Sequence, residues 1–427
     1  MIILLISIFI LGYLAIATEN IIRINKAAIA LVSGVLCWTV FILYSSDPHH
    51  VVEELIAHVG ELSGILFFLL GAMTIVELID AHDGFELITD RINEKDKRKL
   101  LWIISFITFF LSAILDNLTT TIVVVSLLRK LIKNEEDRLF FSGMVVVAAN
   151  AGGAWSPIGD VTTTMLWIGN QITAFNIIIK LIIPSIICLL VPLIYLSFNL
   201  KGKIDRPIVD KISKERKVSS SHQSIVFYSG IIILILVPVF KSVTHLPPFM
   251  GILLGLGLLW IITEIIHDKK AEEDKGPLSV VEALRKIDAP SILFFLGILI
   301  SIAALQSAGI LTELAHWLSR TLPNDNYIVI SFGLLSSIID NVPLVAAAQG
   351  MYNLSNYPID HYFWEFLAYC TGTGGSILII GSAAGVAAMG MEKINFLWYL
   401  KKISFLALLG FFAGAIAYIL QHELLGI

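Results

Sequence analysis

The sequence predicts an all-α polytopic membrane protein built from two inverted-topology repeats, and three observations support this fold class. Hydrophobic residues make up 57% of the 427-residue chain, whereas charged residues make up only 15%. Many apolar runs approach the ~20 residues that a helix needs to cross a bilayer. Finally, an Asp-Asn pair interrupts two of these runs, in ILDNLTTTIVVV and in IIDNVPLVAAA.

The composition also narrows the function. The mean hydropathy is +0.85 and the net charge is −5, without a basic face apart from the loops, so we expect lipid and no nucleic acid as a partner. The cysteines Cys37, Cys188 and Cys370 all lie inside apolar runs and follow no metal or disulfide spacing. They are read as small core residues, and no cofactor is expected.

The first apolar run, 1–17, ends in Ala-Ile-Ala, as the cleavage site of a signal peptide does. It lacks a basic n-region, however, and cleavage would leave Arg23 and Lys26 in a translocated loop, against charge preference. We therefore predict that this run is the first spanning helix. The complete list of predicted spans is 1–17, 27–44, 62–80, 139–168, 173–199, 224–241, 249–266, 290–307, 363–390 and 403–421.

Two further stretches, 100–133 and 327–352, each consist of two short apolar arms around a polar tip. If both are re-entrant hairpins, every Lys and Arg except Lys180, Lys241 and Arg320 lies on one side of the membrane. A full crossing would instead separate the KDKRK and RKLIK clusters. The positive-inside rule therefore predicts hairpins, a cytoplasmic basic side, and both termini on the other side.

With that topology, the chain divides into repeated units. Each repeat contains a spanning helix, a hairpin, a broken spanning helix and a final spanning helix, in opposite orientations. The predicted segments are scaffold helices at 1–61; a first repeat at 62–199, with hairpin 100–133 and broken helix 139–168; a linker at 200–223; scaffold helices at 224–266; a cytoplasmic loop at 267–289; and a second repeat at 290–427, with hairpin 327–352 and broken helix 363–390.

The breaks in these helices indicate a binding site. A backbone break at membrane depth is tolerated only where protein or water surrounds it, and half-helices that meet at the midplane of inverted repeats hold ions in transporters. The side chains at the breaks carry oxygen atoms and include no Lys, Arg or His, which favours a small hard cation such as Na+ or Li+. The candidate ion- and proton-binding residues are Asp116, Asn117, Thr119, Thr120, Asn150, Ser156, Asp160, Thr162, Thr163, Ser336, Asp340, Asn341, Thr371, Thr373 and Ser376.

Within this set we predict Na+ at the two tips, between Asp116-Asn117 and Asp340-Asn341. Ionised carboxylates are costly in a membrane and mark ion or proton pathways. Burial favours the protonated form of a carboxyl group and a bound cation favours the ionised form, so Na+ and H+ compete for it. Glu77 and Glu61 are candidates for a proton relay.

The paired Asp-Asn tips, the stretch AANAGGAWSPIGDVTTTMLW at 148–167 and the later TGTGGS together resemble the NhaD-type sodium/proton antiporters of the ion transporter superfamily. The resemblance implies an inner-membrane secondary antiporter that exchanges Na+ or Li+ for protons. It also implies a homodimer and an elevator-type movement of hairpins and broken helices against a scaffold. The dicarboxylate branch carries Ser-Asn-Thr at its tips, and the aspartates Asp116 and Asp340 at the position of that serine favour cations.

Two alternatives stay open. The first is a carboxylate or oxyanion carrier on the same scaffold. The second is an intramembrane aspartyl protease, which Ile158-Gly159-Asp160 and a second membrane aspartate faintly resemble. An inverted repeat with paired hairpins has no role in peptide cleavage, and we expect that the protein is not an enzyme.

Overall fold

The computed structural model describes residues 1–17, 22–89, 92, 94–206, 218–268, 276–322 and 324–425. Parts of the predicted linker and cytoplasmic loop, 207–217 and 269–275, lie outside the described residues. Within the described ranges the chain is helical and has no strand, which confirms the prediction of an all-α polytopic protein. In the described part of the chain, eight helical segments are long and apolar enough to cross a membrane: α3 (Lys26–Tyr44), α4 (Pro48–Ala81), α6 (Lys97–Leu115), α10 (Ala174–Asn199), α11 (Ser220–Thr244), α12 (Pro248–His267), α15 (Ala289–Ser307) and the segment Phe396–Leu424. The last segment contains α21 (Phe396–Tyr399), the π-helical turn Leu400–Ser404 and most of α22 (Phe405–Leu425).

Helix α4 begins at Pro48, well before the predicted start of its span at 62. The Asp47 side chain accepts a hydrogen bond from His50 N, and Pro48 occupies the first helical turn, where its missing N–H costs nothing. His49, His50 and His58, which lie between two predicted spans, therefore belong to this helix. Hydropathy marks only the apolar part of a helix, whereas its start is determined by the cap.

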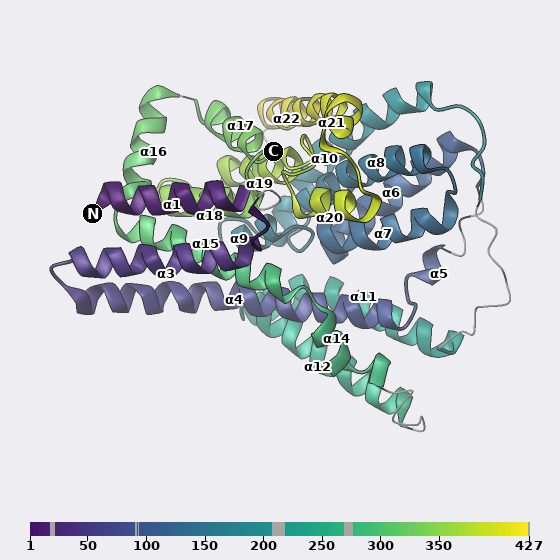
Figure 1. Cartoon of the computed structure of the whole chain (residues 1–427), viewed down its shortest axis with the longest axis horizontal. Coiled ribbons are helices and arrows are strands. Elements are labelled where there is room, and N and C mark those ends of the chain that lie inside the picture. Colours follow the sequence, from purple (N-terminus) through teal and green to yellow (C-terminus); the bar gives the residue numbers. More distant parts are fainter. Residues whose placement is uncertain are drawn as a thin grey trace.

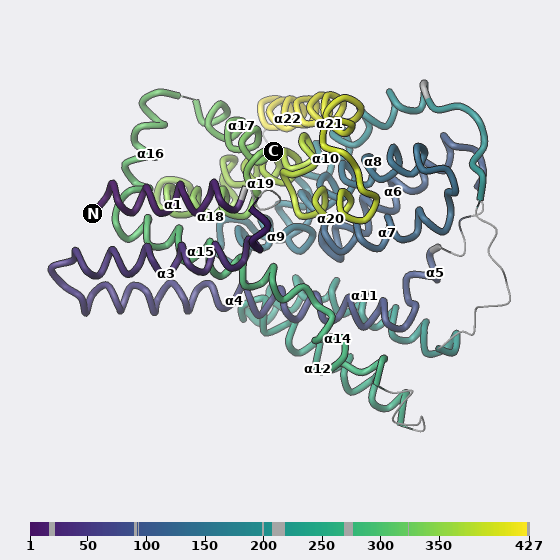
Figure 2. The backbone as a smooth tube through the Cα atoms, viewed as in Figure 1, coloured from purple at the N-terminus to yellow at the C-terminus, as the bar shows by residue number. Residues whose placement is uncertain are grey.

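The first predicted hairpin is formed by α6 and α7 (Asn117–Leu131), which lie side by side in Figure 2. Asp116 alone joins them. Asp116 has φ 92° and ψ 161°, a region that residues other than glycine rarely adopt. The two ends of the hairpin bind one segment of the chain, since Lys97 N donates to Gly202 O (3.1 Å) and Lys133 N donates to Asp205 O (2.8 Å). The chain therefore turns back at Asp116 and returns to the end from which it started.

The second hairpin has the same form. Helix α17 (Asp325–Leu335) is followed by a turn, and α18 (Asn341–Met351) begins directly after Asp340. Tyr357 links the two outer ends, because its hydroxyl donates to Asp325 Oδ1 (3.3 Å) and its ring lies 5.4 Å from that of Tyr352.

Each predicted broken helix is interrupted. Helices α8 (Glu135–Ala154) and α9 (Val161–Ile168) form the first, and α19 (Tyr362–Gly374) and α20 (Ala383–Glu392) form the second. In all four helices the ends that meet the break are buried, so the polar backbone there is enclosed by protein.

Hairpins and broken helices make equivalent contacts in the two halves. Ser112 Oγ donates to Ala149 O (2.6 Å), and Ser336 Oγ donates to Thr371 O (2.7 Å). A Cβ on Gly152 would lie 2.2 Å from Phe109 O, and one on Gly374 would lie 2.0 Å from Gly333 O. In both halves only glycine allows the broken helix to approach the hairpin backbone so closely.

The remaining helices flank these units. Helices α1 (Ile2–Ala17), α3, α4 and α15 run roughly parallel, while α6, α7 and α8 lie side by side further along the molecule (Figure 1). Trp38 Nε1 on α3 donates to Ile300 O on α15 (2.9 Å). The described residues also include helices that were not predicted, among them α5 (Glu86–Thr89), α14 (Val280–Lys286) and α16 (Ile310–Thr321), which runs across its neighbours in Figure 1.

The basic segments of the first half meet at one end of the molecule. Lys97 Nζ lies 2.7 Å from Asp137 Oδ1. Arg129 and Arg138 share the carboxylate of Glu392, with N···O distances of 2.6 and 3.1 Å. These pairs join the outer ends of α6, α7, α8 and α20.

Candidate functional site

Asp160 occupies the break between α8 and α9 and caps α9. Its Oδ1 accepts hydrogen bonds from Thr162 N (2.9 Å) and from Thr162 Oγ1 (2.8 Å), and Thr163 Oγ1 donates to Asp160 O (2.9 Å). The residue is only 1% exposed. The predicted residues Asp160, Thr162 and Thr163 thus form one helix start, with a buried carboxylate at its centre.

The two hairpins meet at this carboxylate through their asparagines. Asn117 Nδ2 donates to Asp160 Oδ2 at 2.6 Å, and Asn341 Nδ2 lies 3.2 and 3.3 Å from Oδ1 and Oδ2 of Asp160. Each asparagine is the first residue of the returning helix of its hairpin. A carboxylate that accepts from four side-chain and backbone donors is best satisfied in its ionised form.

Asn150 and Ser382 complete this group. Asn150 Oδ1 accepts from Asn117 Nδ2 (3.2 Å), while Asn150 Nδ2 donates to Ser382 Oγ (3.0 Å) and to Val146 O (3.0 Å). Ser382 caps α20 by accepting from Gly385 N (3.2 Å), as Asp160 caps α9. We call Asp160, Asn117, Asn150, Asn341 and Ser382 the central cluster.

Asp116 faces away from the central cluster. Thr119 donates to both of its carboxylate oxygens, from N to Oδ1 (2.7 Å) and from Oγ1 to Oδ2 (2.8 Å). The carboxylate lines a small cavity together with Leu69, Ala72 and Met73 of α4. The first tip therefore points its asparagine at Asp160 and its aspartate at a neighbouring helix.

Asp340 also has partners of its own. Its Oδ1 accepts from Val342 N (3.4 Å), and its Oδ2 lies 3.9 Å from Lys26 Nζ. The ammonium group also lies 4.4 Å from the ring centroid of Phe294. The expectation of a site without a basic residue is therefore corrected. Lys26 is the first residue of α3 and lies next to a short basic loop in the sequence. This position did not indicate that its side chain contacts a hairpin tip.

The other predicted hydroxyls mostly bind backbone carbonyl groups. Thr120 differs, because it is fully buried and its hydroxyl has no hydrogen-bond partner among the described residues. The remaining donations are from Ser156 Oγ to Ala113 O, Ser336 Oγ to Thr371 O, Thr371 Oγ1 to Leu367 O, Thr373 Oγ1 to Tyr369 O and Ser376 Oγ to Thr373 O, all between 2.5 and 2.7 Å.

The two candidate relay residues lie on α4, apart from the central cluster. Glu77 Oε1 lies 3.8 Å from Lys286 Nζ. Glu61 Oε2 lies 3.8 Å from His58 Nδ1, and the Glu61 side chain is 80% exposed. Glu61 lines a cavity of about 510 Å³ that also reaches Met165 on α9 and Gln349 on α18.

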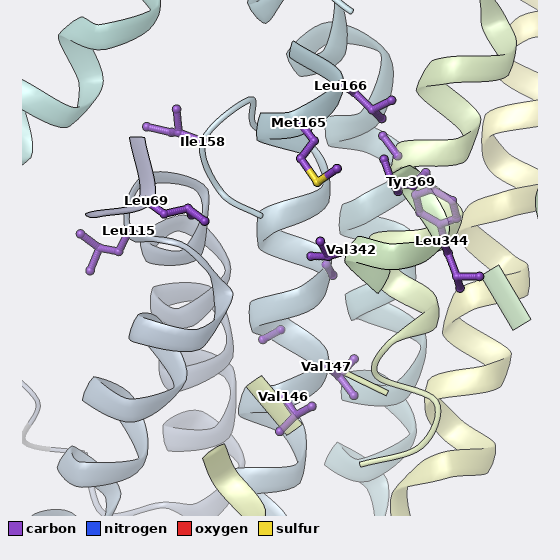
Figure 3. Close-up of a cluster of buried hydrophobic side chains, with 14 of the residues drawn as sticks. Leu69, Leu115, Val146, Val147, Ile158, Met165, Leu166, Val342, Leu344 and Tyr369 are labelled. Atoms are coloured by element: carbon purple, nitrogen blue, oxygen red, sulfur yellow. The ribbon is translucent and has the colours of Figure 1, made fainter. Parts of the chain in front are cut away.

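Apolar side chains surround the helix breaks. Figure 3 shows Leu115 and Ile158 beside Leu69, and Val342 near Met165. Such surroundings strengthen the attraction between a carboxylate and a cation. Among the described residues, no group of three or more His, Cys, Asp or Glu could hold a metal ion.

Known proteins resemble this chain over almost its whole length. The family model described as "CitMHS: Citrate transporter" matches residues 13–372. Sodium/proton antiporter 1 of Arabidopsis thaliana is 49% identical over 416 residues, which cover 97% of this chain and 71% of the relative. The Na+/H+ antiporter NhaD of Alkalimonas amylolytica is 28% identical over 417 residues, covering 91% and 84% of the two chains. The chain therefore belongs to the CitMHS transporter family and, within it, to the group of NhaD-type sodium/proton antiporters.

Proposed function

We propose that this protein is a secondary active antiporter that exchanges Na+ or Li+ for H+ across a membrane, with Asp160 as the central ion-binding carboxylate. The observation that carries the proposal is the meeting of two hairpin asparagines on this one buried carboxylate. The names of the plant and bacterial relatives support the same exchange.

The chemistry of the asparagines suits a site that alternates between two states. An amide offers N–H donors on one side and a carbonyl oxygen on the other. With N–H groups directed at Asp160, the amides stabilise the ionised carboxylate without a cation. Rotation of the amides of Asn117 and Asn341 would present their Oδ1 atoms instead, so that these oxygens and the carboxylate enclose a small cation.

Proton coupling follows from competition at the same oxygens. A carboxylate in an apolar interior holds either a proton or a cation, because an uncompensated charge is costly there. Asp116 and Asp340 flank the central cluster and are further acceptors. The predicted Na+ position between Asp116-Asn117 and Asp340-Asn341 remains a prediction, and the contacts above favour its two asparagines together with Asp160.

The predicted movement belongs to this proposal. Re-entrant hairpins, inverted repeats and an elevator-type displacement against the scaffold would expose the central cluster to the two sides in turn. The equivalent contacts of Ser112 and Ser336 support two related halves. The inner-membrane location, the homodimer and both termini on the non-cytoplasmic side are also part of the proposal.

A citrate carrier is the alternative that the family description names. Three carboxylates, Asp116, Asp160 and Asp340, lie at or beside the breaks and would repel a polyanion. We therefore favour cation exchange.

Everted membrane vesicles test the proposed function. Addition of Na+ or Li+ is expected to dissipate a preformed ΔpH in wild-type vesicles, whereas K+ and Ca2+ are included as comparison ions. Asp160→Asn is expected to abolish the response while the protein remains in the membrane. Asp47→Asn is the matched control, because asparagine caps the exposed start of α4 as well as aspartate does. Exchange at the wild-type rate in Asp160→Asn, or ΔpH changes that depend on citrate, would contradict the proposal.

A further inference from the structure

One side chain connects a scaffold helix to the tip of the second hairpin. Lys26 lies at the start of α3, and its Nζ lies 3.9 Å from Asp340 Oδ2. The side chains are 26% and 18% exposed, so the pair is largely shielded from solvent. Phe294 of α15 lies beneath the ammonium group, at 4.4 Å from ring centroid to Nζ. Two neighbouring helices therefore hold this charge against the tip.

The corresponding carboxylate of the first hairpin has a different environment. Asp116 and Asp340 occupy equivalent positions before Asn117 and Asn341. Apart from Asp116 itself and Thr164, the residues that line the cavity at Asp116 are apolar. Among the described residues, a lysine faces the carboxylate of the second tip and none lines the cavity at the first, which makes the two tips chemically unequal although both carry Asp-Asn.

Lys26 is connected to the central cluster through Asp340. Asp340, which it faces, directly precedes Asn341, and Asn341 donates to both oxygens of Asp160. A cation that bound at Asp340 would meet the positive charge of Lys26. The ammonium group and the entering ion would also compete for Asp340.

We infer that Lys26 is a resident counter-charge of Asp340, which an entering Na+ must displace before the second hairpin can separate from the scaffold. This inference rests on the proposed function. It makes Lys26 a positioning residue that lowers the affinity for Na+ and keeps the unloaded hairpin attached to α3. The ion pair thereby makes separation of the second hairpin from α3 less favourable when no Na+ is bound.

The test measures Na+ binding without transport. The midpoint of thermal unfolding of the purified, detergent-solubilised protein is followed as NaCl replaces choline chloride at pH 8.5, because a ligand that binds only the folded state raises this midpoint. In Lys26→Met, whose apolar side chain still covers Phe294, the half-saturating Na+ concentration is expected to fall about fivefold. Lys26→Arg keeps the charge and is expected to resemble the wild type.

Two further variants distinguish the effect of losing the Lys26–Asp340 ion pair from the effect of losing any lysine charge. Lys241→Gln is the matched control, because Lys241 also links a scaffold helix to α9, through Trp167 O (2.6 Å) and the Trp167 ring. Lys241 forms no ion pair with a carboxylate of the described residues. It is expected to leave the half-saturating Na+ concentration unchanged. In an Asp340→Asn background, Lys26→Met is expected to have no further effect on the half-saturating Na+ concentration, since the ion pair with Asp340 is already broken.

The outcomes distinguish the two proposals. If Na+ stabilises the wild type and Lys26→Met to the same degree at every concentration, the role of Lys26 is refuted while the proposed function stands. Equal shifts in Lys26→Met and Lys241→Gln refute it as well. If Na+ does not stabilise the wild type at all, the proposed function and the inference both fail.

Discussion

At the residue scale, the buried amide of Asn150 determines how the two halves of the site are connected. It accepts from Asn117 of the first hairpin and donates to Ser382 of the second broken helix. The first contact joins the consecutive helices α7 and α8, whereas the second joins residues 232 positions apart in the sequence. Asn150 therefore aligns Asn117 with Asp160 and connects the two halves of the site.

Asn150→Ala is expected to weaken Na+ binding about tenfold, because Asn117 Nδ2 loses one acceptor and Ser382 Oγ loses its donor. The half-saturating Na+ concentration for ΔpH dissipation in vesicles measures this effect. Ser142→Ala, on the same helix, is the control, since this buried hydroxyl has no hydrogen-bond partner among the described residues. Wild-type affinity in Asn150→Ala would remove Asn150 from the site.

The sequence identified the chemical groups of the site, but it did not predict their directions. Asp116, Asn117, Asn150, Asp160 and Asn341 were recognisable because polar residues are rare in apolar runs. Which of two adjacent side chains faces the centre depends on the backbone at the turn, where Asp116 has φ 92°. The contact of Lys26 with Asp340 depends on tertiary packing alone, which no local pattern encodes.

At the scale of elements, close backbone contacts hold each hairpin against its broken helix. Gly374→Ala is expected to destabilise the protein by about 1–3 kcal/mol, because the new Cβ would lie 2.0 Å from the backbone oxygen of Gly333. Gly390→Ala is the control on the neighbouring α20, where a Cβ meets nothing within 4 Å. It is expected to be neutral or stabilising by up to about 1 kcal/mol. Thermal unfolding in detergent compares the two, and equal midpoints would contradict the predicted role of Gly374.

The shared carboxylate of Glu392 is a second contact between elements. It accepts from Arg129 at the end of α7 and from Arg138 near the start of α8, and its side chain is only 2% exposed. Glu392→Gln is expected to lower the unfolding midpoint, because Arg129 and the partly buried Arg138 lose the buried carboxylate that they share. The exposed pair of Arg285 and Glu282 provides the control, and Glu282→Gln is expected to change the midpoint little. A similar small effect in both variants would show that the buried pair contributes no stability.

Hydropathy predicted most elements, and it failed where a helix is not apolar. The hairpin arms and helix breaks followed from short apolar runs around polar residues. The first part of α4 and the whole of α16 carry charged residues at helical spacing, so they fell below the hydropathy of a span. For such helices the caps are the better signal, as Asp47 and Pro48 show.

At the scale of the whole molecule, the distribution of basic residues predicts an orientation. A membrane-impermeant maleimide is expected to label Ser46→Cys, between α3 and α4, in intact cells. Lys203→Cys, beside the outer ends of the first hairpin, is expected to be labelled only after the cells are opened. The native cysteines are buried and give a low background. The reverse labelling pattern would invert the proposed topology.

The single-residue joint at Asp116 has a consequence for protein engineering. Its backbone conformation suits glycine, whereas its carboxylate serves the proposed chemistry. The residue therefore has two roles, since it forms the turn of the hairpin and supplies a negative charge. Asp116→Gly would remove both the charge and the backbone strain of the turn. Asp116→Asn would remove the charge and keep the strain. Comparing the two variants separates these roles. Any gain in thermal stability that only Asp116→Gly shows reports the backbone strain at this turn.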